Sequence, residues 1–326
     1  MLTINLNIVM FTKASFAVAA VLISFGAIIG RVSPLELLVM GIIEVIGYTL
    51  NEAIIFNGPI NVYDVGGSMN IHTFGAYCGL ACSAIIGLRQ RVGEKNAVPS
   101  YISCIFGMIG TLFLWLFWPS FNSGAFDATL QYQRMIIITN TVLSLTGSCI
   151  AAFCLSILIR NKLNMDDVLN ATLAGGVAIG AASSLITNPA GALAIGLISG
   201  SISTLGYAKL SEKLARWHIY DTCGINNLHG MPGLFGGLSS AVFISAYNLT
   251  PLNIGLATVD FSNVDFSKQG ALQVAGTFIS LGIGLATGAV CGGVLYLLYK
   301  VENTDFFEDE HFWEMHVEPT EGTKQH

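Results

Sequence analysis

Apolar runs of membrane length dominate this chain of 326 residues. A helix needs about 20 mostly apolar residues to cross a bilayer. Nine runs of this kind occur, at about 14–30, 35–57, 66–88, 100–118, 135–159, 168–187, 190–208, 225–247 and 270–299. Only 10% of the residues are charged, whereas soluble domains carry about 25%. The sequence therefore predicts an all-α, polytopic membrane protein embedded in a lipid bilayer.

The remaining composition bears on which partners the chain could bind and on where its membrane domain ends. No basic patch is present that would bind nucleic acid. The seven cysteines lack C-x-x-C spacing and lie mostly in apolar runs, which favours small buried side chains over a disulfide or a metal site. We expect a transmembrane domain over residues 1–300 and an acidic, non-membrane tail over 301–326. Asn248 opens the sequon N-L-T-P, but the following proline disfavours glycosylation there.

One stretch of the chain appears twice. Residues 64–75 read D-V-G-G-S-M-N-I-H-T-F-G, and residues 221–233 read D-T-C-G-I-N-N-L-H-G-M-P-G. In both copies glycine follows the aspartate by three residues and histidine follows it by eight. Each copy opens a membrane-length apolar run, where an ionisable side chain is costly and is therefore a candidate for function. The repeat singles out His72 and His229.

The distribution of lysine and arginine predicts the orientation of these segments. Alternate loops, together with the tail, hold 11 of the 14 basic residues. The tail should therefore be cytoplasmic, and nine spans then place the N-terminus outside. His72 and His229 consequently lie on segments that cross in opposite directions, which is typical of an inverted repeat with its transport site at the repeat interface.

Three roles are open for the two histidines. Each could be a solitary buried histidine bonded to nearby backbone. A metal site would need three or four converging ligands, and Asp64 and Asp221 lie about 12 Å along a helix axis from their histidines. The two aspartates are instead expected to start helices as N-caps. The third possibility is a pair of neutral imidazoles lining an apolar pore, since imidazole both donates and accepts hydrogen bonds.

Four stretches closely resemble the Rh (Rhesus) glycoproteins, the animal branch of the ammonium transporter family. They read G-G-S-M-N-I-H-T-F-G-A-Y at 66–77, G-T-L-F-L-W-L-F-W-P-S-F-N-S at 110–123, N-A-T-L-A-G-G-V-A-I-G at 170–180 and D-T-C-G-I-N-N-L-H-G-M-P-G at 221–233. The resemblance implies a plasma-membrane homotrimer with one narrow pore in each subunit and no cofactor. Ammonium would be recruited at the pore mouth, lose its proton and cross as ammonia.

The resemblance also implies roles for individual residues. His72 and His229 match the paired pore histidines, which should meet within hydrogen-bond reach. Phe16 and Phe121 match a stacked phenylalanine gate above them. Asp64 matches the aspartate that orients groups at the outer recruitment site, and members without transport activity lack the histidine pair.

Two departures from the family pattern stand out. Family members often carry an acidic residue where this chain has Asn164, with Asp166 and Asp167 close by. The family has eleven or twelve helices, so the resemblance implies that about three initial spans are absent from this sequence and that the chain is truncated. We expect such a chain by itself to be unstable or to conduct poorly.

The sequence favours ammonium or ammonia transport, without enzymatic activity. One alternative is a non-transporting interaction subunit in heterotrimers of the same family, and another is a carbon dioxide channel. A membrane enzyme or metalloprotein is the remaining alternative, and no third ligand or nucleophile lies near either histidine in the sequence.

Overall fold

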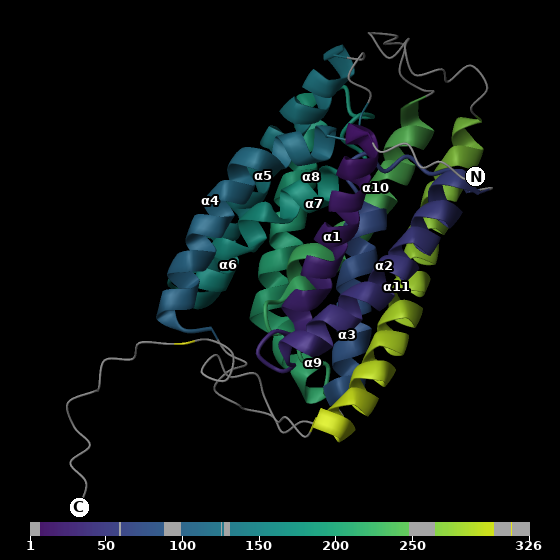
Figure 1. The fold of residues 1–326 in the computed structure, drawn as a ribbon. Coiled ribbons are helices and arrows are strands. Elements are labelled where there is room, and N and C mark those ends of the chain that lie inside the picture. Colours follow the sequence, from purple (N-terminus) through teal and green to yellow (C-terminus); the bar gives the residue numbers. More distant parts are fainter. Residues whose placement is uncertain are drawn as a thin grey trace, which may run out of the picture.

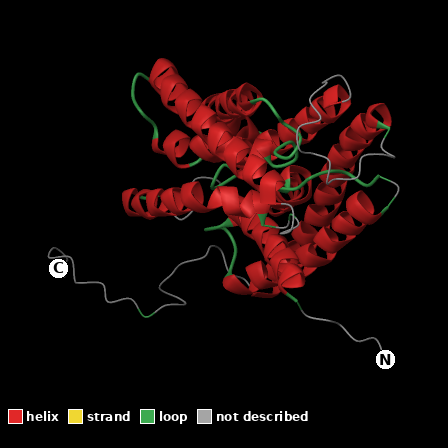
Figure 2. Ribbon diagram, turned by 90° about the horizontal axis from the view of Figure 1, so that it is seen from above, coloured by secondary structure: helices red, strands yellow, loops and turns green. Residues whose placement is uncertain are grey.

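The computed structural model describes residues 7–58, 60–87, 99–124, 126, 131–247, 265–302 and 314. Regular structure within these residues is entirely helical, as the prediction of an all-α chain requires (Figure 2). Asn248 and all of the tail beyond Glu302 except Glu314 lie outside the described residues.

The helices fall into a first and a second half along the chain (Figure 1). The first half contains α1 (Ile8–Ile28), α2 (Pro34–Asn57), the π-helix η1 (Ser68–Thr73), which continues as α3 (Phe74–Gly87), and then α4 (Tyr101–Ser123) and α5 (Gln131–Arg160). The second half contains α6 (Met165–Leu169), η3 (Ala171–Leu173), α7 (Ala174–Ile179), α8 (Pro189–Leu205), η4 (Gly206–Leu210), α9 (Ser211–Arg216), η5 (Asn226–Gly230), α10 (Met231–Tyr247) and α11 (Phe266–Glu302).

Seven helices among the described residues are long and apolar enough to cross a membrane. They correspond to seven of the nine predicted runs. The run at 168–187 is instead divided among α6, η3, α7 and a turn, and its residues from 171 to 186 are all buried. A broken helix is tolerated at membrane depth when protein surrounds it. The run at 225–247 forms η5 and α10, which fall outside those seven. The chain is thus an integral, multi-pass membrane protein.

Polar residues next to prolines set where two of the long helices begin. Ser33 caps α2, accepting from the amide of Glu36, while the Glu36 carboxylate accepts from the amide of Ser33. Pro34 follows at the first helical position, where its missing N–H costs nothing. Asn188 and Pro189 start α8 in the same way, with the Asn188 side chain accepting from the amide of Ala190. These signals explain why predicted and observed starts agree closely.

Two helix groups pack around separate cores. One core joins α1, α2, α3 and α11 around Phe74, and another joins α5, α7, α8 and α10 around Ile179. Close approach depends on glycine: a Cβ on Gly175 or Gly196 would collide with the backbone of Ser144. In Figure 1 the α4–α5 side and the α2–α11 side flank α1, α7 and α10. The repeat segments η1 and η5 lie between the two groups and touch each other.

Candidate functional site

The first repeat copy is a sharp turn that leads into a π-helix. Gly67 has φ +75°, a left-handed conformation that glycine adopts without steric cost. Oδ2 of Asp64 accepts from the amides of Met69 at 2.9 Å and Asn70 at 2.8 Å. The carboxylate therefore satisfies first-turn amides, as a helix cap does, although the capping position itself is Gly67 and not the predicted Asp64.

The second copy repeats this geometry. Gly224 has φ +72°, and the π-helix η5 follows it. Asp221 accepts from the amide of Ile225 through Oδ1 at 2.8 Å and from the amide of Asn226 through Oδ2 at 2.9 Å. Both copies thus place a histidine on a π-helix, a local distortion that is frequent at functional sites.

The two copies enter the protein from opposite ends. At one end, a Cβ on Gly87, the last residue of α3, would come within 2.6 Å of the carbonyl of His218, just before the second copy. At the other end, a Cβ on Gly236 in α10 would come within 2.9 Å of Ser68 Oγ. The α3 and α10 segments therefore run in opposite directions (Figure 1), as expected for an inverted repeat.

His72 and His229 meet at the crossing of these segments. Their Nδ1 atoms lie 3.1 Å apart, and their rings are inclined by only 13° with centroids 5.1 Å apart. His72 is buried, and His229 is partly buried. The two rings therefore form the hydrogen-bonded pair that the sequence predicts.

A hydrogen bond between two Nδ1 atoms restricts the protonation of the pair. When both imidazoles are neutral, one Nδ1 carries the proton and the other accepts it. The first ring then presents an acceptor at Nε2, and the second presents an N–H donor at Nε2. Nε2 of His72 is buried and has no hydrogen-bond partner within the described part of the chain. The pair can therefore offer a passing molecule one acceptor and one donor.

Aromatic side chains cover one side of His72. Phe121 and Trp118 place their ring centroids 5.9 Å and 5.8 Å from that of His72. Phe16 packs against Phe121 at 5.1 Å, with the rings inclined by 63°. The two phenylalanines are therefore adjacent as expected, but they meet edge to face instead of in a parallel stack. Sequence reasoning missed Trp118, although its spacing of three residues from Phe121 puts both on one helix face.

A cavity of about 270 Å³ lies beside Phe16 and is lined mainly by side chains from α1, α2 and the first repeat copy. We call it the mouth cavity; its lining includes Lys13, Phe16, Tyr48, Glu52, Asp64 and Asn70. Tyr48 accepts from the side-chain amide of Asn70 at 2.8 Å, which ties α2 to η1. Lys13, Tyr48, Glu52 and Asn70 were not identified from the sequence, because α1, α2 and η1 meet only in the folded chain.

The mouth cavity contains an incompletely bonded carboxylate. Oδ1 of Asp64 is buried without a hydrogen-bond partner among the described residues. Burial raises the pKa of Asp64 to about 6, although the amides of Asn70 and Met69 act in the opposite direction. The segment before Asp64 is held in place by Gln273 of α11, which bonds both the amide and the carbonyl of Tyr63.

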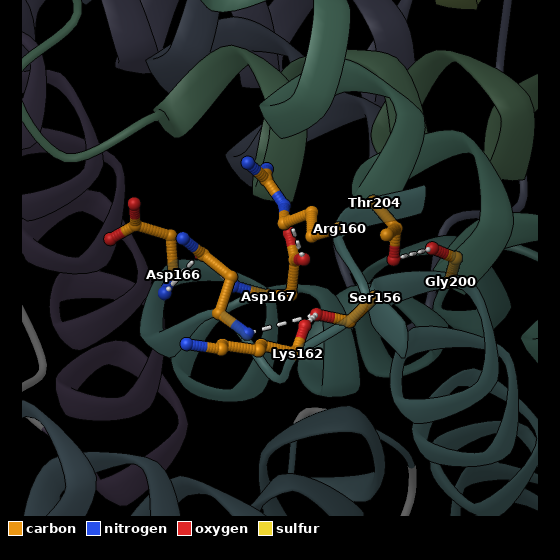
Figure 3. Close-up of polar contacts among 8 residues, drawn as sticks. Ser156, Arg160, Lys162, Asp166, Asp167, Gly200 and Thr204 are labelled. Atoms are coloured by element: carbon orange, nitrogen blue, oxygen red, sulfur yellow. Dashed lines mark hydrogen bonds and ion pairs between the residues drawn. The ribbon is translucent and has the colours of Figure 1, made fainter. Parts of the chain in front are cut away.

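The acidic residues beside Asn164 lie where α5 ends and α6 begins. Asn164 caps α6, accepting from the amides of Asp166 and Asp167. Asp167 is fully buried, and its Oδ2 pairs with Nε of Arg160 at 3.1 Å. Figure 3 shows the Asp166 carboxylate directed away from this ion pair. The ion pair of Asp167 therefore links α6 to α5. The Asp166 carboxylate takes no part in this ion pair.

The described residues contain no group of three or more histidine, cysteine or acidic side chains arranged to hold a metal ion. The pair of histidines faces aromatic rings instead, and Asp64 and Asp221 are engaged with backbone amides. The arrangement is therefore suited to hydrogen bonding with a small molecule.

Comparison with known proteins identifies relatives along nearly the whole chain. A family model described as Ammonium Transporter Family matches residues 1–312. The chain is 43% identical over 318 residues to the human ammonium transporter Rh type C, covering 93% of this chain and 65% of that protein. The canine ammonium transporter Rh type C is 41% identical over 321 residues, covering 94% of this chain and 69% of the relative. The chain thus spans about two thirds of the length of these relatives.

Solved structures agree with this match. The Nitrosomonas europaea Rh50 channel superposes with a TM-score of 0.76 at 33% identity, covering 94% of this chain and 75% of that one. Mep2 of Saccharomyces cerevisiae superposes with a TM-score of 0.69 over 90% of this chain and 65% of its own, but at 18% identity it supports the fold alone. The resemblance to the Rh branch is confirmed, and the chain belongs to the ammonium transporter family.

Proposed function

We propose that this protein conducts ammonia across a membrane. The path runs from the mouth cavity, past Phe16 and Phe121, to the pair of His72 and His229. The observation that carries the proposal is the 3.1 Å contact between the two Nδ1 atoms beside an unpartnered, buried Nε2 of His72. Ammonia is itself a donor and an acceptor, so it matches the complementary groups that this pair offers.

Ammonium transfers its proton to water on the entry side, at the mouth cavity, before it reaches the histidines. A cation in an apolar passage loses its hydration and pays a cost of at least several kcal/mol. The rings of Phe16, Phe121 and Trp118 carry no formal charge, and a cation–π attraction of about 2 kcal/mol offsets only part of this cost. The carboxylate of Asp64 lies before the rings, where it can still attract the cation. Neutral ammonia loses much less hydration and continues past the histidines.

The family and the charge distribution support a proposed assembly and orientation. The proposed functional unit is a homotrimer in the plasma membrane with a separate pore in each subunit. The excess of lysine and arginine in alternate loops places the C-terminal end of α11 in the cytoplasm. Labelling of single cysteines introduced at the two ends of α11 in intact cells would test this orientation.

Ammonia flux in vesicles is the direct test of the proposed function. The protein is purified in a full-length background and reconstituted, and the internal pH change is followed after an ammonium gradient is applied. His72→Ala or His229→Ala should slow this change by about 5- to 150-fold, since each removes a hydrogen-bond partner worth about 1–3 kcal/mol.

The matched control is His218→Asn. His218 is an exposed histidine with φ +61°, and asparagine tolerates that left-handed conformation. The control should conduct as the native protein does. Unchanged flux in both pore variants would overturn the proposal and favour a non-transporting interaction subunit.

A further inference from the structure

An ion pair lies in the lining of the mouth cavity. Nζ of Lys13 on α1 lies 3.2 Å from Oε1 of Glu52 on α2. Both side chains line the cavity. The Glu52 side chain is 22% exposed and the Lys13 side chain 56%, so the pair is reached from solvent and also faces the cavity.

The pair lies on the helix faces that lead to the aromatic rings. Lys13 precedes Phe16 by three residues, and Glu52 follows Tyr48 by four, so each pair of residues shares a helix face. Phe16 and Tyr48 line the same cavity. A cation entering between α1 and α2 therefore meets Lys13 and Glu52 together with the groups around Asp64.

Lys13 resembles the cation that this protein would transport. Its side chain ends in an ammonium group with three N–H donors, so it makes the same contact with a carboxylate as a free ammonium ion. The charged side chains described in the cavity lining are Lys13, Glu52 and Asp64. Lys13 thus reduces the net charge of the lining from −2 to −1 and occupies one oxygen of Glu52.

We propose that Lys13 acts as a built-in competitor for ammonium in the mouth cavity. The tethered ammonium group of Lys13 holds Glu52 and must be displaced before a free ammonium ion can use that carboxylate. Lys13 thereby sets the ammonium concentration range in which the channel works. This inference rests on the proposed function and concerns recruitment of the cation, upstream of the histidine pair.

The expected effect is modest because the pair is partly exposed. Exposed ion pairs have coupling energies that correspond to about a two- to fivefold change in an equilibrium constant. Lys13→Gln should therefore lower the half-saturating ammonium concentration by about two- to fivefold. Because the pore beyond the cavity is unchanged, the flux at high ammonium should remain that of the native protein.

The experiment measures ammonia flux in vesicles over a range of ammonium concentrations at fixed pH. Lys13→Gln should raise the rate at low ammonium and leave the rate at high ammonium unchanged. Lys13→Arg keeps the charge and should behave as the native protein. Lys268→Gln is the matched control, because Lys268 is exposed at the start of α11 and does not belong to the described cavity lining.

Glu52 provides the test of competition. Glu52→Gln should raise the half-saturating concentration. In that background, Lys13→Gln should give a smaller gain than in the native protein, because Lys13 no longer has a carboxylate to occupy. An equal gain in both backgrounds, or no gain in either, would overturn the inference. If His72→Ala lowers flux while the Lys13 variants match the native protein, the inference fails and the proposed function stands.

Discussion

The two repeat copies share a backbone and differ in their surroundings. Both combine an aspartate bonded to helix amides, a left-handed glycine and a π-helix that carries a histidine, although the residues between them differ. The first copy borders the mouth cavity and the aromatic rings, whereas the second copy starts beside Tyr207. The shared backbone places one histidine from each copy in a pair. The different neighbours give the two sides of that pair different surroundings.

The aspartates show this difference most clearly. Asp64 bonds both amides through one oxygen and leaves the other without a partner in the described structure. Asp221 uses one oxygen for each amide. One copy therefore retains hydrogen-bonding capacity at the mouth cavity, and the other devotes both oxygens to holding the backbone.

The largest expected effect comes from the glycines. Gly224→Ala would force a Cβ into the ring of Tyr207, whose hydroxyl is fixed by the carbonyls of Cys223 and Gly224. Gly67→Ala would press on the side chain of Ile71, which, unlike the Tyr207 ring, is not held by a hydrogen bond. With the left-handed strain added, we expect the free energy of unfolding to fall by about 2–4 kcal/mol for Gly224→Ala and about 1–2 kcal/mol for Gly67→Ala.

Thermal unfolding in detergent would measure both glycine variants. Gly293→Ala is the control, because a Cβ there meets nothing within 4 Å among the described residues. Equal losses for Gly67→Ala and Gly224→Ala would show that backbone strain alone decides the cost, and that the neighbouring side chains do not matter.

The second prediction treats the two histidines as a unit. If the Nδ1–Nδ1 bond fixes the hydrogen bonding of both rings, removing either ring disables the pair. The double variant with alanine at positions 72 and 229 should then conduct within about threefold of either single variant, because groups that act together are not additive. Vesicle flux measures this. Losses that multiply would mean that the two rings act independently and do not form a functional unit.

The smallest effect separates the aspartates. Asp64→Asn can keep one oxygen on both amides, so its stability should change by less than about 0.5 kcal/mol while recruitment of ammonium weakens. Asp221→Asn must turn an NH₂ group toward one amide and should lose about 1–2 kcal/mol of stability. Unfolding and low-ammonium flux measured on the same samples would test this. The reverse order of stability would contradict the assignment of oxygens given above.

The general architecture was accessible from sequence because it depends on local patterns. Run length predicted the spans and charge predicted their orientation. The duplicated Asp–Gly–His spacing singled out the two histidines, and their meeting was expected from the opposite crossing of their segments and from the resemblance to the Rh glycoproteins. Hydropathy predicts a single span at 168–187, because it cannot distinguish a segment surrounded by lipid from one buried in protein. The structure breaks it into short helices, and its residues from 171 to 186 are all buried in protein.

Other features depend on contacts between distant residues. Lys13 and Glu52 lie on separate helices, so no spacing rule connects them. Arg31 is one of the 11 basic residues that predict the orientation, but it is buried, donates to Ser83 Oγ at 2.8 Å and lies over the ring of Tyr220. A count of charges cannot distinguish a loop cation that determines membrane orientation from a buried one such as Arg31, which connects the end of α1 to α3 and to the start of the second copy.

The bond between the two Nδ1 atoms also limits how a proton could follow ammonia. A proton taken up at one Nε2 can be relayed across the Nδ1–Nδ1 bond and released from the other Nε2 only if both rings exchange tautomers. The pair is then set for the opposite direction and cannot relay a second proton the same way until both rings are restored. A neutral molecule that binds and leaves without exchanging a proton needs no such reset. Under the proposed function, this contact would limit repeated proton transfer in one direction and would place no such limit on the passage of ammonia.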